Sequence, residues 1–204
     1  MGNIMGNKNK NIIWDKIMDK EVLDSEIIQE IESVKHNDSG FDINGLDEER
    51  DGWTLLKYAV RSNREKLVEY LLMDPNINVN HKSPLSEFTA MHLLCIYTDN
   101  VHILKLFLGH RDININNEIF LSQTELHCAC CNNRIKIVKE LLLDARINIM
   151  LGSLWGVKAR YIAKDEGHVR IVNILKRIEY TFLIRIPNGV LCRDIVRMII
   201  EEYV

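Results

Sequence analysis

The sequence predicts an all-α fold built from tandem antiparallel helix pairs. Thr54, Thr89, Thr124 and Lys158 align with spacings of 35, 35 and 34 residues, and a pattern of helix, turn and helix follows each of them. Within each unit the apolar residues recur at helical spacing and form a stripe too large for one helix pair to bury alone. The 204 residues are 47% hydrophobic and 27% charged, a composition typical of folded chains. Stacked repeats account for these observations together.

The repeat units follow one another along most of the chain. The pattern after each aligned position covers 52–60, 67–72 and 76–78, then 89–95, 103–108 and 112–114, then 124–130, 137–142 and 146–148, and finally 159–175. Upstream, the apolar-periodic stretches 12–18 and 25–34, followed by 41–44, indicate a degenerate first unit. Small residues at Ala59, Ala129, Cys130 and Ala163 should allow neighbouring first helices to approach closely.

This pattern resembles the ankyrin repeat. His92 stands where that family has histidine, whereas Leu55, Ala90, Glu125 and Ala159 stand where it usually has proline, so the helix starts rely less on a preset φ. The resemblance implies a curved solenoid of antiparallel helix pairs with short β-turn fingers. We therefore expect a flexible N-terminal tail at 1–11, an ankyrin-repeat domain at 12–178 and a non-repeat helical tail at 179–204. Within the domain, the degenerate repeat spans 12–47, and the others span 48–82, 83–117, 118–151 and 152–178.

The resemblance also implies a protein-binding function, as a scaffold or inhibitor that regulates a partner protein by occupancy. In ankyrin proteins the finger loops and the exposed ends of the first helices form a concave binding face. Carried onto this sequence, the finger positions include Leu85, Leu121 and Val157, and the main partner-binding residues are Trp53, Arg61, Ser62, Phe88, Ile96, Tyr97, Gln123, Cys131, Asn132, Trp155, Asp165 and Glu166. Exposed Trp and Tyr side chains are typical anchors at interfaces. The alternative is that the aromatic residues pack onto their own loops.

Composition argues against several other classes of function. The net charge of −3 gives no general attraction to nucleic acid. No apolar run approaches the ~20 residues that a membrane-spanning helix needs. An odd number of cysteines, five, without a secretory signal favours an intracellular protein, cytoplasmic or nuclear. No nucleophile elbow, phosphate loop or zinc-protease signature is present, so we expect neither an enzyme nor a cofactor.

One cluster could carry chemistry. His127, Cys128, Cys130 and Cys131 include metal-ligand types, and His127 and Cys131 lie one helical turn apart. Their repeat positions give a structural explanation, with His127 as the family histidine and Cys130 as a small packing residue. We expect the structural role and no metal, with a zinc-binding catalyst as the minor alternative.

The tail after the repeats contains a turn at Pro187-Asn188-Gly189 and then an apolar helix. Capping the open end of the solenoid is the simplest role for this helix. The tail also resembles the F-box-like tail of poxviral-type ankyrin proteins, which implies a substrate adaptor that recruits a cullin ubiquitin ligase. Cys192 replaces the expected proline in that pattern. The adaptor residues would be Leu191, Cys192, Asp194, Ile195, Ile199 and Tyr203.

Overall fold

The computed structural model describes residues 12–153, 155–185 and 193–202, with side chains other than those of 181–185 and 193. The chain divides into two compact units. The first contains 12–94 together with Lys105–Ile113, and the second contains Cys95–Leu104 together with the described residues from Asn114 onward. The predicted flexible tail 1–11 and the adaptor residues Leu191, Cys192 and Tyr203 lie outside the described residues.

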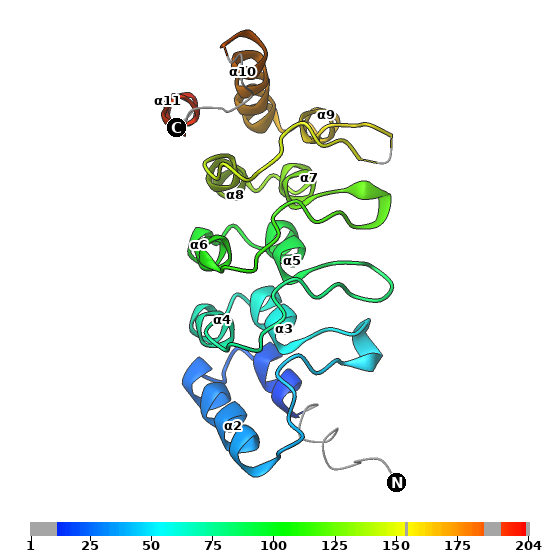
Figure 1. The fold of residues 1–204 in the computed structure, drawn as a ribbon, viewed down its shortest axis with the longest axis vertical. Coiled ribbons are helices and arrows are strands. Elements are labelled where there is room, and N and C mark those ends of the chain that lie inside the picture. Colours follow the sequence, from blue (N-terminus) through cyan, green and yellow to red (C-terminus); the bar gives the residue numbers. More distant parts are fainter. Residues whose placement is uncertain (1–11, 154, 186–192, 203–204) are drawn as a thin grey trace. The chain divides into compact units, whose positions relative to one another are not determined.

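The first unit consists of helices joined by short turns. Residues 12–18 are helical. They are followed by α2 (Asp24–Asn37), the short 3-10 helix η1 (Glu48–Arg50), α3 (Leu55–Arg61) and α4 (Glu65–Leu72). The helices α3 and α4 pack side by side as a pair, and α2 packs on α4 (Figure 1). The start of α5 (Ala90–Tyr97) and the end of α6 (Val101–Gly109) also belong to this unit.

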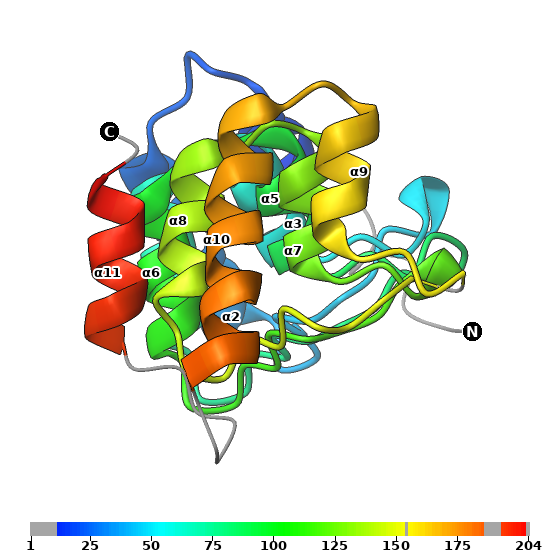
Figure 2. The same ribbon diagram turned by 90° about the horizontal axis from the view of Figure 1, so that it is seen from above.

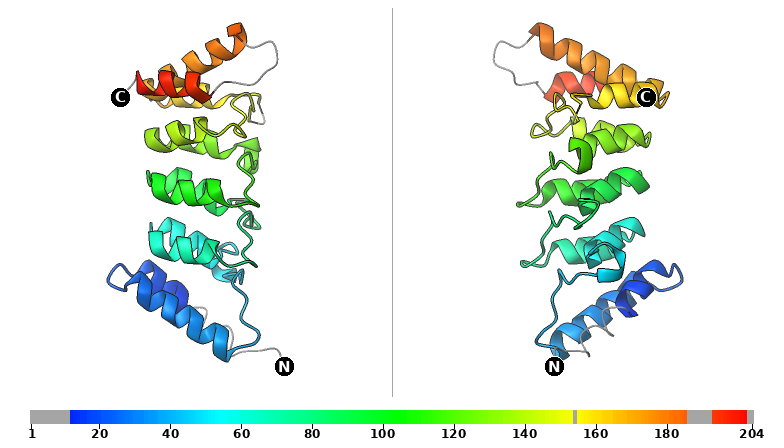
Figure 3. Two further views of the ribbon diagram at one scale, coloured as in Figure 1. Left: turned by 60° about the vertical axis from the view of Figure 1, so that its left-hand side comes forward. Right: turned by 90° about the vertical axis from the view of Figure 1, so that its right-hand side faces the viewer.

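The second unit repeats the same arrangement. It contains η2 (Phe120–Ser122), α7 (Glu125–Cys131), α8 (Ile135–Leu142), α9 (Ala159–Asp165), α10 (Val169–Arg185) and α11 (Arg193–Glu201). The helix α7 packs on α8 and α9, and α10 packs on α9 and α8. The last helix, α11, lies along α10 (Figures 2 and 3). The helix α10 continues past position 178, where the sequence predicts the end of the repeats.

The repeat threonines begin the first helices because their side chains satisfy free backbone N–H groups. Thr54 accepts a hydrogen bond from Lys57 N at 3.4 Å, and Thr89 accepts one from His92 N at 3.3 Å. At Thr124 the side chain of His127 completes a capping box, in which the ring Nδ1 accepts from Thr124 N at 3.2 Å. These caps start the helices although Leu55, Ala90 and Glu125, and not proline, follow the threonines.

A second recurring contact joins neighbouring repeats. Arg64 donates from Nε to Ile17 O at 2.6 Å, Arg134 donates from NH2 to Ile96 O at 2.6 Å, and His168 Nε2 lies 2.9 Å from Cys131 O. Each carbonyl group lies near the end of the preceding repeat's first helix, where the backbone has no helical partner. Each of these side chains therefore ties one repeat to the one before it.

The packing supports the predicted fold class. Ala59, Ala129, Cys130 and Ala163 have no exposed surface, as close helix packing requires. Within the described residues the only β structure is three isolated bridges, one each at Asp47–Trp53, Ile119–Gln123 and Gly152–Lys158. The prediction of an all-α fold of repeated helix pairs with short fingers is confirmed. None of the described helices is long and apolar enough to cross a membrane.

Candidate protein-binding surface

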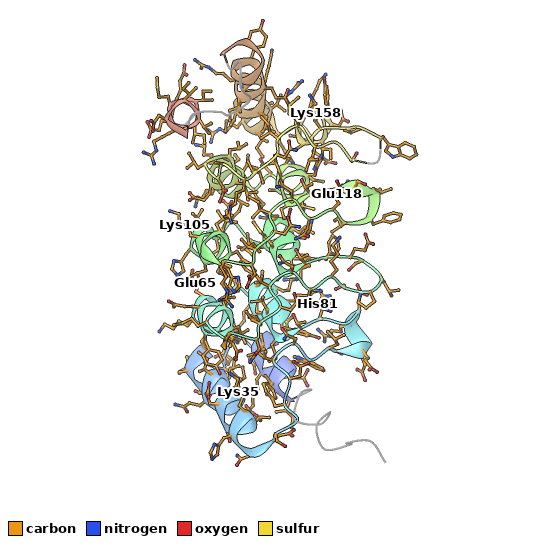
Figure 4. All side chains as sticks on the ribbon, viewed as in Figure 1. Lys35, Glu65, His81, Lys105, Glu118 and Lys158 are labelled. Carbon is orange, nitrogen blue, oxygen red and sulfur yellow. The ribbon has the colours of Figure 1, made fainter. Side chains whose placement is uncertain are left out.

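Four loops precede the repeated first helices, and we name them finger 1 (47–53), finger 2 (83–88), finger 3 (119–123) and finger 4 (152–158). Fingers 1, 3 and 4 are each closed by one of the isolated bridges. Finger 2 is closed by a hydrogen bond from Ser83 N to Phe88 O at 3.1 Å. Figure 4 labels Glu118 and Lys158, which stand at the bases of fingers 3 and 4.

Finger 1 packs inward. Trp53 is half-buried, and its ring meets the ring of Tyr58 edge-on at 5.3 Å. Tyr58 is itself buried and donates a short hydrogen bond to Asp47 at the start of the finger. Trp14 stacks on the same tyrosine at 6.0 Å. This placement favours the local-packing alternative for Trp53.

Finger 2 presents Leu85 at its tip, with 84% of the residue exposed. Asp51, from finger 1, accepts hydrogen bonds from Leu85 N at 2.7 Å and from Ser86 N at 3.1 Å. Partial burial alone would raise the pKa of Asp51, but the bonds from Ser86 and Leu85 outweigh it and lower that pKa. The anion at Asp51 therefore fixes the backbone of finger 2. Phe88 is half-buried beside His92, with the ring centres 6.3 Å apart.

A buried polar cluster lies beneath finger 2. Lys57, on α3, has no exposed surface and donates to Ser83 Oγ at 2.7 Å and to His81 Nδ1 at 3.1 Å. His81, labelled in Figure 4, lies on the segment that leads into finger 2. Burial lowers the pKa of Lys57 to about 8, and the charge of Asp51 opposes that shift only in part. Burial, and then the charge of Lys57, lower the pKa of His81.

Fingers 3 and 4 belong to the second unit and carry the most exposed aromatic side chains among its described residues. Phe120 is 70% exposed at the tip of finger 3, and Trp155 is 77% exposed on finger 4. Leu121 is partly exposed, whereas Gln123 and Val157 are half-buried at the finger bases. His127 Nε2 lies 3.1 Å from Val157 O, so the capping histidine of α7 also holds finger 4.

The predicted helix-end residues differ in how far they reach solvent. Arg61, Tyr97, Asp165 and Glu166 are exposed, and Ser62, Ile96, Cys131 and Asn132 are half-buried. The carbonyl groups of Ile96 and Cys131 accept the bonds between repeats described above, and Asn132 Nδ2 donates to Cys128 O at 2.8 Å. The half-buried Ile96, Cys131 and Asn132 therefore hold the helix ends in place, and the exposed members reach solvent.

The His127 and cysteine cluster has the geometry of a packed helix. Both ring nitrogens of His127 are engaged, by Thr124 and by Val157 O. Burial, then the charge of Glu125, raise the pKa of Cys128 to about 12, and burial also raises the pKa of Cys130. Thiols with such raised pKa values stay protonated, whereas zinc binds thiolates. Among the described residues no group of three or more His, Cys, Asp or Glu side chains could hold a metal ion.

The described part of the C-terminal tail packs against the last repeat. Ile199 is only 6% exposed, and Val196 and Ile200 are also buried on the side where α11 meets α10. Ile195 is half-buried and Asp194 is exposed. Val196, Ile199 and Ile200 are therefore engaged within the second unit, whereas Met198 of the same helix is 68% exposed.

Phe120 is an exposed finger residue that the sequence analysis missed. It lies four positions before Thr124, as Leu85 lies four positions before Thr89, so the repeat alignment carried the signal that selected Leu85. The polar cluster of Lys57, His81 and Ser83 was missed as well, because a charged side chain at a helical position is usually exposed.

Two family models of known proteins match the centre of the chain. A family model described as ankyrin repeats (3 copies) matches residues 76–151, and one described as ankyrin repeat matches residues 51–81. Neither match includes the tail at 179–204. No curated protein matches the chain.

Proposed function

We propose, from the premise that residues 51–151 are ankyrin repeats, that this chain is a non-catalytic module that regulates a partner protein by occupancy, as a scaffold or inhibitor. Ankyrin repeats are in general protein-binding modules. The observation that carries the proposal is the exposure of Phe120 and Trp155 on fingers 3 and 4. Aromatic side chains held in water are typical anchors of protein interfaces.

The fingers that carry these anchors are fixed before a partner arrives. Ile119 N donates to Gln123 O at 2.9 Å across finger 3, and Ser153 N donates to Val157 O at 3.0 Å across finger 4. The contact between His127 and Val157 O adds a tie to α7. Because these backbone bonds are already formed, less of the binding free energy is spent on forming them when a partner binds.

The helix ends supply the remaining contacts. Tyr97 adds a third exposed aromatic group at the end of α5, and Asp165 and Glu166 add negative charge at the end of α9. Trp53 and Phe88 are half-buried. They support their fingers, and only part of each ring can contact a partner. Leu85 is the exposed apolar residue that finger 2 offers.

A substrate adaptor for a cullin ubiquitin ligase is the alternative for the tail. The burial of Ile199 on α10 supports the capping role, because an adaptor helix would have to leave α10 before its apolar residues could contact a ligase. Co-precipitation of a cullin-ligase component with the full chain, lost on deletion of residues 191–204, would favour the adaptor. If the ligase component still co-precipitates after the deletion, it binds another part of the chain.

The main proposal is tested by comparing the proteins that the wild-type chain and a Phe120→Ser/Trp155→Ser variant retain from an extract of the cells that make the protein. Met73→Ser is the matched control, because Met73 is 79% exposed but lies outside the fingers. A protein retained by wild type and by Met73→Ser, and lost by the double variant, is then purified and its affinity is measured directly.

We expect the double variant to bind that protein at least ~10-fold more weakly, as for the loss of interface anchors. Met73→Ser should change the affinity by less than about twofold, a small surface effect. The thermal unfolding of all three chains should be similar, because the substituted residues are exposed. Equal retention by wild type and the double variant would refute the proposed surface.

A further inference from the structure

Two basic side chains meet inside the fold at the base of finger 2. Lys57, on α3, has no exposed surface, and its Nζ donates to His81 Nδ1 at 3.1 Å and to Ser83 Oγ at 2.7 Å. His81 and Ser83 lie two residues apart on the segment that enters the finger. A buried cation whose bonded acceptors are neutral is costly, because no opposite charge in direct contact offsets its lost hydration.

The contact between the two nitrogen atoms accommodates only one proton. While His81 is neutral, its Nδ1 accepts from the ammonium group of Lys57. A proton on Nδ1 would turn that acceptor into a donor and would bring a second positive charge within 3.1 Å of the first. The two side chains therefore titrate as a coupled pair, and a second proton breaks the contact between them.

The charged groups around the pair leave this conflict in place. Asp51, on finger 1, acts on Lys57 at longer range, and hydrogen bonds from finger 2 engage its carboxylate. On α5, the contact with the helix-capping threonine engages His92 Nδ1. Exposed charged side chains on the same segment are those of Lys82 and Glu87. Burial, and then the charge of Lys57, lower the pKa of His81 from 6.5, so the fold resists the second proton.

Ser83 links the pair to the backbone of finger 2. Its N–H donates to Phe88 O at 3.1 Å and its carbonyl accepts from Glu87 N at 3.0 Å, so two bonds at the base of the finger begin at this residue. The tip is held separately, because Asp51 accepts from Leu85 N at 2.7 Å. Despite burial, the hydrogen bonds from finger 2 keep the pKa of Asp51 below 3.8, so the contact at the tip persists in mild acid.

We infer that Lys57 and His81 form a pH-sensitive switch that holds the base of finger 2 closed at neutral pH and releases it in mild acid. His81 is half-buried, so its ring reaches solvent by moving outward once it carries a proton. The backbone of Ser83 moves with it and loses its bond to Lys57, while Asp51 still holds the tip. The switch is a property of the free chain and requires no partner, so it is independent of the proposed function.

Amide hydrogen exchange of the full chain at pH 7.5 and pH 5.5, measured by fast mixing, tests the switch. Each rate is divided by the intrinsic exchange rate of that amide at the same pH, which gives a protection factor. The amides of Ser83 and Glu87 report on the base of finger 2, because their bonds close it. The amides of Leu85 and Ser86 report on the tip, because Asp51 accepts from both.

His81→Asn is the main variant, because the asparagine oxygen can accept from Lys57 in place of Nδ1 but does not titrate. His102→Asn is the matched control, because His102 is exposed on α6. In wild type and in His102→Asn we expect the protection factors at the base to fall roughly three- to tenfold from pH 7.5 to pH 5.5. The limit is about tenfold because a released imidazole with a pKa near 6.5 is about nine-tenths protonated at pH 5.5.

The protection factors at the base in His81→Asn, and those at the tip in all chains, should change by less than about twofold. Equal protection of the wild-type base at both pH values would overturn the inference. An undiminished loss in His81→Asn would do so as well, since another group would then be responsible, and an equal loss at the tip would show that the opening is not confined to the base. If His81→Asn does not fold, Lys57→Met decides, because it removes the second charge, and an undiminished loss there would also overturn the inference.

Discussion

Replacing Lys57 with methionine should change how the stability of the fold depends on pH. The ammonium group of Lys57 is fully buried, and its neighbours are the neutral acceptors Ser83 Oγ and His81 Nδ1, with the carboxylate of Asp51 acting at longer range. Burial lowers its pKa from 10.5 to about 8. Methionine has a similar length and no charge, so it removes this titration while filling much of the same space.

The direction of this change in stability follows from the difference in proton binding between the folded and the unfolded chain. Between pH 8 and 10.5 the unfolded chain binds a proton at Lys57 that the folded chain has lost, so this residue makes stability rise with pH across that window. A pKa change from 10.5 to about 8 corresponds to about 3 kcal/mol. The free energy of unfolding of the wild type, minus that of Lys57→Met, should therefore increase by about 3 kcal/mol from pH 7.5 to pH 11.

Urea unfolding at half-unit steps of pH measures this difference. The subtraction is necessary because other groups make stability fall with rising pH in the alkaline range, opposite to the effect of Lys57. The pKa values of Tyr58 and Cys95 are raised in the fold by burial, so their contributions to stability are lost as pH rises, but they are present in both proteins. A difference that stays flat, or falls as pH rises, would refute the burial of a charged lysine beneath finger 2.

The same pair of proteins gives a second result in acid. Burial and the charge of Lys57 lower the pKa of His81, so the unfolded chain binds more protons below pH 6.5 and the fold loses stability there. Removing the lysine charge eliminates one of the two causes of the lowered His81 pKa. We therefore expect the loss below pH 6.5 to be smaller in Lys57→Met, and an equal loss would mean that the two side chains do not interact.

Three further substitutions test the packing. Arg64→Met should lower the free energy of unfolding by about 3–5 kcal/mol, since it removes a buried cation that holds the backbone of the N-terminal repeat. Amide hydrogen exchange should accelerate first in residues 12–18. Asp51→Ala should cost about 1–3 kcal/mol in urea unfolding, since it leaves two backbone N–H groups of finger 2 without their acceptor. Ala129→Leu should lower the free energy of unfolding by about 1–3 kcal/mol, because the larger side chain overfills a closely packed site. Ala145→Leu, at an exposed position, is the control and should leave the stability unchanged. Equal melting temperatures of the two variants would contradict close packing of α7.

The repeat fold could be predicted from the sequence because its signals are local. Thr54 and Thr124 form their helix caps with residues three positions later, and the small residue Ala129 lies at a fixed distance from its cap. A period near 35 residues then repeats these signals along the chain. Each unit thus carries enough information to be recognised by itself.

The exposure of individual finger residues could not be predicted in the same way, because it depends on how each loop packs against its own helix pair and against the next repeat. Trp53 is covered because Tyr58 packs against its ring. Lys57 is buried because Ser83 and His81, more than twenty residues later, supply its acceptors. The contact between Trp53 and Tyr58 lies within one repeat but is not implied by helical periodicity, and the bond from Lys57 to Ser83 reaches into the next repeat. The tip of finger 3 depends instead on backbone angles that its residue types would not suggest.

The bonds from Arg64, Arg134 and His168 to the preceding repeat have a consequence for how such a chain can evolve. In all three cases the acceptor is a main-chain carbonyl group, at Ile17, Ile96 and Cys131. Every residue type provides that acceptor, so the donor does not require a particular side chain in its neighbour. A duplicated or recombined repeat would therefore keep these bonds to its new neighbour without compensating substitutions at the acceptor, which leaves the finger residues free to diverge toward new partners.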